Sequence, residues 1–260
     1  MLVLLPPSEG KETPSAGKRL DLDTLSFPSL SSTRVDVLDA LQRLCAGPAA
    51  KARTALGISA RQDAELERNR SLLTAPAAPA GEVYSGVLYD ALGLATLDAR
   101  ARRRAAGDIA ICSALFGLLR VTDRIPAYRL SGDTTLPRIG RLTGVWRDPL
   151  ADAIRTAAGR GVVLDLRSSA YVALGPVPDE LAERTAIVRV FQEKASKRTI
   201  VSHHNKATKG RIVRSLLSEP KSRTVDDVAG ALGAAGYRVE LEAPRGPGKP
   251  WAIDVVVTEL

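Results

Sequence analysis

The sequence has few of the residues that build metal and redox sites: two cysteines and two histidines among 260 residues. Cys45 and Cys112 form neither a C-x-x-C pair nor a zinc-binding pattern, so we interpret them as two reduced structural thiols. His203 and His204 are adjacent, and on a strand they would point to opposite faces and could not share one ion. Neither G-x-x-x-x-G-K-[ST] nor G-x-G-x-x-G occurs, which argues against a P-loop or dinucleotide fold. We therefore expect no metal site and no cofactor.

Long apolar runs are also missing. The opening apolar run, residues 1–5, is too short for a signal sequence and no basic segment precedes it. No other run approaches the roughly 20 residues that a membrane span requires. These features predict a cytoplasmic globular protein that has no contact with a membrane.

Positive charge, by contrast, is in excess. The chain has 37 Lys and Arg against 29 Asp and Glu, a net charge of +8 and a pI near 9.8. Such a balance favours polyanionic partners, nucleic acid first. Residues 189–223 concentrate this excess, because they hold ten basic side chains and only two acids, Glu193 and Glu219.

Within that basic segment the pattern predicts a short strand over residues 199–202 and a helix over residues 206–217, with Asn205 as its N-cap. Lys206 and Lys209 would then lie in the first turn, against the preference of the helix dipole for acidic neighbours. An anion held by the helix amides and both ammonium groups would resolve the conflict. A solvated basic helix end is the alternative.

Alternating apolar segments indicate a mixed α+β fold: one compact domain over residues 1–260, in which helices surround a mixed β-sheet. Strands are expected at 2–5, 108–112 and 161–166, each followed by a polar loop or a small-residue segment, and ligands gather at such ends. Thr224 is expected to cap a helix that ends near residue 236. Residues 237–242 and 251–258 are expected to pair as a hairpin.

A second candidate for phosphate contact lies between two short expected helices. Residues 55–59 resemble the hairpin of a helix-hairpin-helix element, in which a glycine turn presents backbone amides to a phosphate. An ordinary helical corner is the alternative, because three acids follow at positions 63, 65 and 67. The residues expected to contact nucleic acid here are Lys51, Arg53, Gly57, Ile58, Ser59 and Arg61.

Other chemistry has weaker support. A serine hydrolase triad could be drawn from Ser113 or Ser168 with His203 and Asp165, yet no G-x-S-x-G elbow is present. A direct thiol peroxidase needs an exposed, electropositive cysteine, whereas Cys112 lies in an apolar segment that predicts burial.

Several blocks in order resemble the peroxide stress protein YaaA family. They are residues 2–11, 84–87, 113–120, 126–130, 165–171 and 202–210, and the S-x-L-[FY]-G-[LV]-L-R and PYRL-like blocks are specific in combination. The resemblance implies a bacterial cytoplasmic protein with a positively charged cleft, a helix-hairpin-helix element, DNA binding and a role in limiting hydrogen peroxide damage. If the family's cleft residues are carried over to the matching positions of this sequence, the cleft would be lined by Ser8, Lys11, Ser113, Arg120, Tyr128, Arg129, Ser168, Tyr171, Lys206, Lys209 and Gly210.

The sequence departs from the family pattern at a few positions. At the block of residues 165–171, Ser169 and Ala170 stand where acidic residues are common in the family, and Ala173 stands where a lysine is common. Near the basic helix, His203-His204 replaces an aromatic pair and Ala207 replaces one of two paired lysines. These changes would alter the substrate or weaken the activity if the family cleft is catalytic.

Two functions fit these observations. The first is a DNA-binding protective protein, in which Arg211 and Arg214 extend the basic helix surface that starts at Lys206. The second is an enzyme or small-ligand binder for a phosphate-bearing or nucleotide-like substrate. It would use the loops after strands in the same cleft, and His203 and Asn205 complete its expected lining.

Overall fold

A mixed β-sheet forms the centre of the structure, a computed structural model that describes residues 1–194, 197–199 and 202–257. Seven strands follow the spatial order β11-β12-β9-β8-β1-β3-β4, and β10 pairs with β9. The five strands from β12 to β3 run parallel to their neighbours, while β4, β10 and β11 are antiparallel. Their bounds are β1 Leu2–Leu5, β3 Ile109–Ser113, β4 Gly117–Arg120, β8 Val163–Asp165, β9 Thr185–Lys194, β10 Lys197–Thr199, β11 Arg238–Glu242 and β12 Trp251–Val257.

Strands β1 and β3 are apolar except for Ser113 at the end of β3, because both faces of this part of the sheet are covered, as is usual for parallel strands. Every residue of β1 and β3 is buried. Strand β1 lies between β8 and β3, with Leu2 opposite Val163 and Val3 opposite Ile109. The carboxyl ends of β1, β3 and β8 consequently meet at one edge of the sheet, as expected from the sequence.

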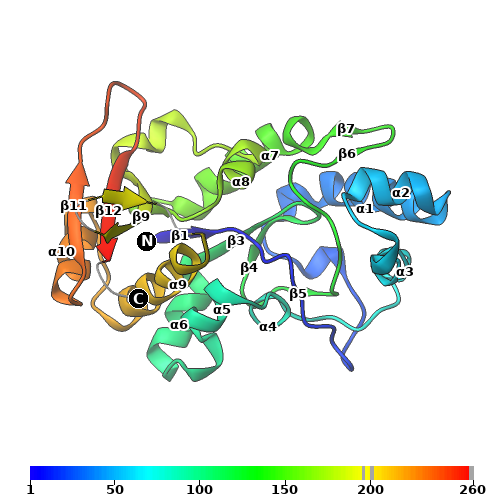
Figure 1. The fold of residues 1–260 in the computed structure, drawn as a ribbon, viewed down its shortest axis with the longest axis horizontal. Coiled ribbons are helices and arrows are strands. Elements are labelled where there is room, and N and C mark those ends of the chain that lie inside the picture. The colour runs from blue at the N-terminus through cyan, green and yellow to red at the C-terminus, as the bar shows by residue number, and fades with distance from the viewer. Residues whose placement is uncertain (195–196, 200–201, 258–260) are drawn as a thin grey trace.

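Helices pack on both faces of this sheet. Figure 1 shows α7 and α8 on one side and α5, α6 and α9 on the other, with α1, α2 and α3 beyond the β4 end. The helices are α1 Ser31–Ala46, α2 Ala49–Leu56, α3 Ala64–Arg70, α4 Ala80–Val83, α5 Val87–Leu92, α6 Ala99–Asp108, α7 Leu142–Ala158, α8 Ser169–Leu174, α9 Ser202–Ser218 and α10 Val225–Ala234. Two small antiparallel pairs, β2 (Ala78–Pro79) with β5 (Arg124–Ile125) and β6 (Thr135–Leu136) with β7 (Gly140–Arg141), lie outside the main sheet.

The expected mixed sheet surrounded by helices is confirmed, as are two local predictions. Thr224 caps α10 through a capping box, since its side chain accepts from the Asp227 amide and the Asp227 carboxylate accepts from the Thr224 amide. Strands β11 and β12 form the expected hairpin, with Val239 opposite Val255.

The start predicted for the basic helix is wrong. Helix α9 begins at Ser202 rather than after Asn205, so Lys206 and Lys209 lie beyond its first turn. The helix dipole therefore creates no conflict with these two lysines, because its effect is confined to the first turn. The strand expected over residues 199–202 is described only at Thr199, which ends β10, and at Ser202, which is helical; residues 200–201 lie outside the described residues.

No helix-hairpin-helix element is identified in the described part of the chain. Gly57 ends α2 with a positive φ of 62°, its amide donates to Thr54, and the Ile58 amide donates to the carbonyl of Arg53. The Ser59 amide donates to the Gln62 side chain. All three amides expected to face a phosphate are already hydrogen-bonded within the corner, and Ile58 is buried.

Among the described residues, none of the helices combines the length and apolar character that a membrane span needs.

Candidate functional site: a lysine–tyrosine cluster at the sheet edge

The loop after β1 carries Lys11 to the edge where the parallel strands end. Its backbone bridges to Tyr84, and the next residue, Glu12, donates its amide to the Val83 carbonyl. The Lys11 amine donates to the carbonyl of Ser8 at 2.9 Å and lies 4.3 Å from the centroid of the Tyr128 ring. The Tyr84 ring centroid is 5.6 Å away. The amine is therefore held by two aromatic faces and by backbone carbonyl groups.

Burial, together with the nearby Arg129 guanidinium, lowers the pKa of Lys11 from 10.5 to about 7. Arg68 acts in the same direction, while the carboxylates of Glu65 and Glu9 oppose the shift. An amine with this pKa is present in both protonation states near neutral pH, which suits acid–base and nucleophilic chemistry.

A chain of three hydroxyl groups lies beside the lysine. The Tyr128 hydroxyl is 2.8 Å from the hydroxyl of Tyr84 and 2.8 Å from that of Ser113. Ser113 Oγ also accepts the amides of Leu115 and Phe116, which leaves its proton for Tyr128. Burial raises the pKa of both tyrosine hydroxyls, so they stay protonated and serve as donors.

Four of the five tyrosines gather here. The Tyr84 and Tyr89 rings stack with centroids 5.6 Å apart, and the Tyr128 ring meets Tyr84 edge-on at 6.5 Å. Tyr89 donates its hydroxyl proton to the Pro6 carbonyl at 2.7 Å, which fixes the loop after β1. Tyr171 comes from α8 and is half-buried. We call Lys11, Tyr84, Ser113, Tyr128 and Arg129 the lysine–tyrosine cluster.

Arg129 supplies the second cation of the cluster. The side chain of the buried Asn69 accepts from the backbone amide of Arg129 and donates to its carbonyl, at 2.9 and 2.8 Å. Within the described residues the guanidinium makes no hydrogen bond: Nε is buried without a partner, and Nη1 is 3.8 Å from the Glu9 carboxylate. A guanidinium with its donors open is suited to a carboxylate or phosphate.

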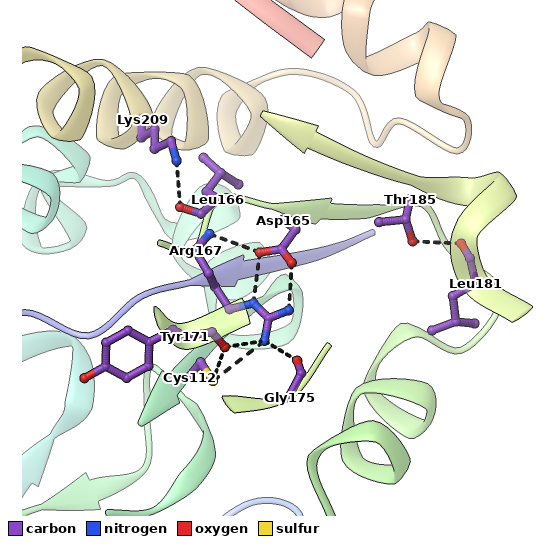
Figure 2. Close-up of polar contacts among 9 residues, drawn as sticks. All are labelled: Cys112, Asp165, Leu166, Arg167, Tyr171, Gly175, Leu181, Thr185 and Lys209. Atoms are coloured by element: carbon purple, nitrogen blue, oxygen red, sulfur yellow. Dashed lines mark hydrogen bonds and ion pairs between the residues drawn. The ribbon is translucent and has the colours of Figure 1, made fainter. Parts of the chain in front are cut away.

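The end of β8 is built around an ion pair that sequence reasoning missed (Figure 2). Arg167 binds both carboxylate oxygens of Asp165, at 2.9 and 2.7 Å, and donates to the carbonyls of Gly175 and Tyr171. Lys209 reaches across from α9 to the Leu166 carbonyl at 2.9 Å, and burial lowers its pKa while Asp165 opposes the shift. The sequence did contain a signal for this ion pair, because Arg167 follows Asp165 by two residues at the end of a predicted strand.

The structure brings some of the expected cleft residues together and separates others. Ser8 accepts the Ser85 amide at 3.1 Å and so anchors the loop, whereas Ser168 is exposed at the start of α8. Arg120 pairs with Ala110 in the β3–β4 hairpin, near the amino end of β3 and away from Ser113. The Asn205 side-chain oxygen is buried without a hydrogen bond from the described residues. The side chain of His203 lies outside them.

Several residues expected to contact nucleic acid have structural roles instead. Arg53 binds both carboxylate oxygens of Asp63, and Arg214 donates to the carbonyls of Leu92, Gly93 and Thr96. Gly210 is buried where α9 packs against α5. Four basic side chains among the expected contacts remain exposed, and we call them the exposed basic residues: Lys51, Arg61, Lys206 and Arg211.

Both thiols are buried, and burial raises the pKa of each. For Cys112 the Arg167 guanidinium opposes the shift without cancelling it. No group of three or more His, Cys, Asp or Glu side chains in the described residues is arranged to hold a metal ion.

The chain was compared with known proteins. The family model described as "Peroxide stress protein YaaA" matches residues 1–243. A UPF0246 protein of Streptomyces coelicolor is 52% identical over 261 residues and covers 100% of both chains. A UPF0246 protein of Corynebacterium glutamicum is 45% identical over 92% of this chain and 95% of its own, and one of Corynebacterium efficiens is 40% identical over 94% and 97%. The chain belongs to the peroxide stress protein YaaA family (UPF0246).

Proposed function

We propose that the lysine–tyrosine cluster binds a small anionic ligand, such as a phosphate ester or carboxylate, and exchanges protons with it as part of the family's role in peroxide stress. The observation that carries the proposal is the proximity of two cations. Lys11 and Arg129 share one partly exposed edge of the sheet, Lys11 has no ion-pair partner among the described residues, and Arg129 has only the exposed Glu9 carboxylate, 3.8 Å from its Nη1. An anion would supply the missing partner.

The hydroxyl chain extends this binding site toward acid–base chemistry. With Ser113 donating to Tyr128 and Tyr128 donating to Tyr84, the Tyr84 hydroxyl keeps a proton that it can donate to an anion or to a developing negative charge. Lys11 can accept a proton in its neutral form and return it in its charged form.

The test is thermal unfolding with inorganic phosphate and a panel of phosphate esters and carboxylates. A ligand at about 100 times its Kd stabilises a protein by about 2.7 kcal/mol, which corresponds to roughly 5–10 °C in Tm for a chain of this size. Lys11→Met and Arg129→Met should remove the shift. Lys18→Met, a change at an exposed lysine outside the cluster, should keep it. Absence of any shift, or equal shifts in all variants, would reject the proposal.

DNA binding is the second candidate, and the specific observation in its favour is the set of exposed basic residues on a chain of net charge +8. Figure 1 shows α2 and α9, which carry Lys51, Lys206 and Arg211, in different parts of the molecule, so one DNA segment would have to extend between them.

Salt-dependent binding tests the second candidate. Each neutralised phosphate adds about 0.9 to the log–log slope on duplex DNA. Replacing Lys206 and Arg211 together by alanine should lower that slope by about 2 if both contact phosphates. Replacement of Arg100 and Arg103, exposed arginines on α6, is the matched control. An unchanged slope in the Lys206/Arg211 variant would remove α9 from the interface.

A further inference from the structure

The Lys11 amine has an unusual set of neighbours for a mostly buried lysine. Its hydrogen bonds go to two backbone carbonyls, of Ser8 at 2.9 Å and Glu9 at 3.4 Å, and it forms no ion pair with a carboxylate among the described residues. Buried lysines are normally paired with acids, because an unpaired ammonium is costly to remove from water. Carbonyl oxygens also accept from a neutral amine, so the lysine keeps hydrogen bonds in both protonation states and no carboxylate among the described residues holds the proton in place.

The two tyrosine rings complete that setting. They cover the amine at 4.3 and 5.6 Å and limit its hydration, which is one cause of its lowered pKa. A neutral amine has a free lone pair, and it is the form that attacks carbonyl carbon. Desolvated lysines of this kind are suited to Schiff-base chemistry.

Arg129 gives the site a means of selecting a substrate. Its guanidinium is without a hydrogen bond in the described structure and influences Lys11 electrostatically, so a bound carboxylate or phosphate would place the rest of a small molecule near the amine. The hydroxyl chain of Tyr84, Tyr128 and Ser113 lies on the same edge of the sheet, and its Tyr84 end keeps a proton to donate.

We propose that Lys11 is a nucleophile that condenses reversibly with the carbonyl group of a small anionic aldehyde or 2-oxo acid, whose anionic group binds Arg129. The inference rests on the proposed function, because it assigns a substrate class to the same cluster.

The reaction is balanced without an oxidant or reductant. The nitrogen lone pair of Lys11 forms a bond to the carbonyl carbon, and a proton passes from nitrogen to the former carbonyl oxygen, which gives a carbinolamine. That hydroxyl group takes up a second proton and leaves as water while the nitrogen lone pair forms the C=N bond of an iminium ion. The iminium nitrogen then releases its remaining proton, which balances the one taken up. The net change is amine plus carbonyl compound to imine plus water, and the reverse reaction is hydrolysis.

Reductive trapping tests this directly in the full-length protein. Glyoxylate is added at pH 7 with sodium cyanoborohydride, and modified lysines are located by peptide mass spectrometry. We expect Lys11 to be modified at least about tenfold faster than the exposed Lys18 and Lys249, because a pKa near 7 leaves far more of its amine neutral. Modification spread evenly over the exposed lysines would overturn the inference. The comparison is made within the wild-type chain, so it does not depend on a variant that folds.

Two further experiments separate anion binding at Arg129 from the reaction of Lys11. Arg129→Met should slow modification of Lys11 by glyoxylate severalfold more than its modification by uncharged propionaldehyde, which is slowed only because loss of the guanidinium raises the pKa of Lys11; equal effects on both reagents would contradict the role of Arg129 in binding the anion. If phosphate stabilises the wild-type protein but glyoxylate leaves Lys11 unmodified, the inference fails while the proposed function stands. If phosphate and the other anions also fail to stabilise the protein, both the inference and the proposed function are rejected.

Discussion

The amine of Lys11 lies 4.3 Å from the centroid of the Tyr128 ring, where an aromatic face takes the position that a carboxylate usually fills beside a buried lysine. Tyr128 in turn joins the hydroxyls of Tyr84 and Ser113. One tyrosine thus both covers the lysine amine and joins the donor chain next to it. The two functions of Tyr128 can be separated by experiment, since one depends on its ring and the other on its hydroxyl group.

Stability should depend on pH through Lys11. Its pKa is about 7 in the folded protein and 10.5 as a model value, so the unfolded chain binds more protons between these values and stability rises with pH across that window. The free energy of unfolding of the wild type, relative to Lys11→Met, should increase by about 1–2 kcal/mol between pH 7 and pH 9. Urea unfolding at several pH values measures it. The free energy of unfolding of Lys18→Met should change with pH in parallel with that of the wild type. If the curve for Lys11→Met is also parallel to that of the wild type, the lowered pKa of Lys11 is contradicted.

Tyr128→Phe keeps the ring and removes the hydroxyl. Two hydrogen bonds are lost in a buried position, so we expect a loss of about 1–3 kcal/mol in stability by urea unfolding, together with weaker anion binding. The pKa of Lys11 should stay low, because the ring remains. Tyr237→Phe is the control: the Tyr237 hydroxyl makes no hydrogen bond to any described residue, and its loss should change stability by less than about 0.5 kcal/mol. Equal losses in the two variants would argue against the hydroxyl chain.

The fold could be predicted where the signal is local. Residues 2–5 and 109–112, which form most of two buried strands, are unbroken apolar runs, and the cap at Thr224 is set by residues three apart. Lys11 and Ser113 were expected in one cleft only from the family resemblance, and in the structure both contact Tyr128.

The basic segment shows why the rest could not be predicted. Charge counted within residues 189–223 omits partners that are distant in the sequence: Arg189 pairs with Glu242 and Asp254, and Lys221 with Asp108. The helix-hairpin-helix prediction at Gly57 was wrong for a different reason. A positive-φ glycine followed by serine serves equally well to end one helix and begin the next, and the sequence does not say whether the amides face a ligand or the chain itself.

Gly210 should be intolerant of a side chain. A Cβ there would overlap the Leu88 carbonyl oxygen and come within 2.9 Å of both Ala91 Cβ and the Leu92 amide, which would push α9 away from α5. We expect Gly210→Ala to lower stability by about 2 kcal/mol or more. Gly230→Ala, in the exposed middle of α10 with no atom within 4 Å of the new Cβ, should instead raise it by about 0.5–1 kcal/mol. Similar effects at both positions would contradict the close packing of α5 and α9.

The two thiols should not react with peroxide in the folded protein. Cys45 and Cys112 are buried and their pKa values are raised by burial, so little thiolate forms near neutral pH and a peroxide has no direct approach to it. A disulfide reagent that reports free thiols should react slowly with the native chain. Once urea has unfolded the chain, the reagent should react readily with both cysteines. Cys45→Ser and Cys112→Ser should keep whatever protection the protein gives cells against hydrogen peroxide. Rapid sulfenic acid formation at Cys112 in the native protein would make a thiol peroxidase the better explanation, and the lysine–tyrosine cluster would then lose its place as the reactive site.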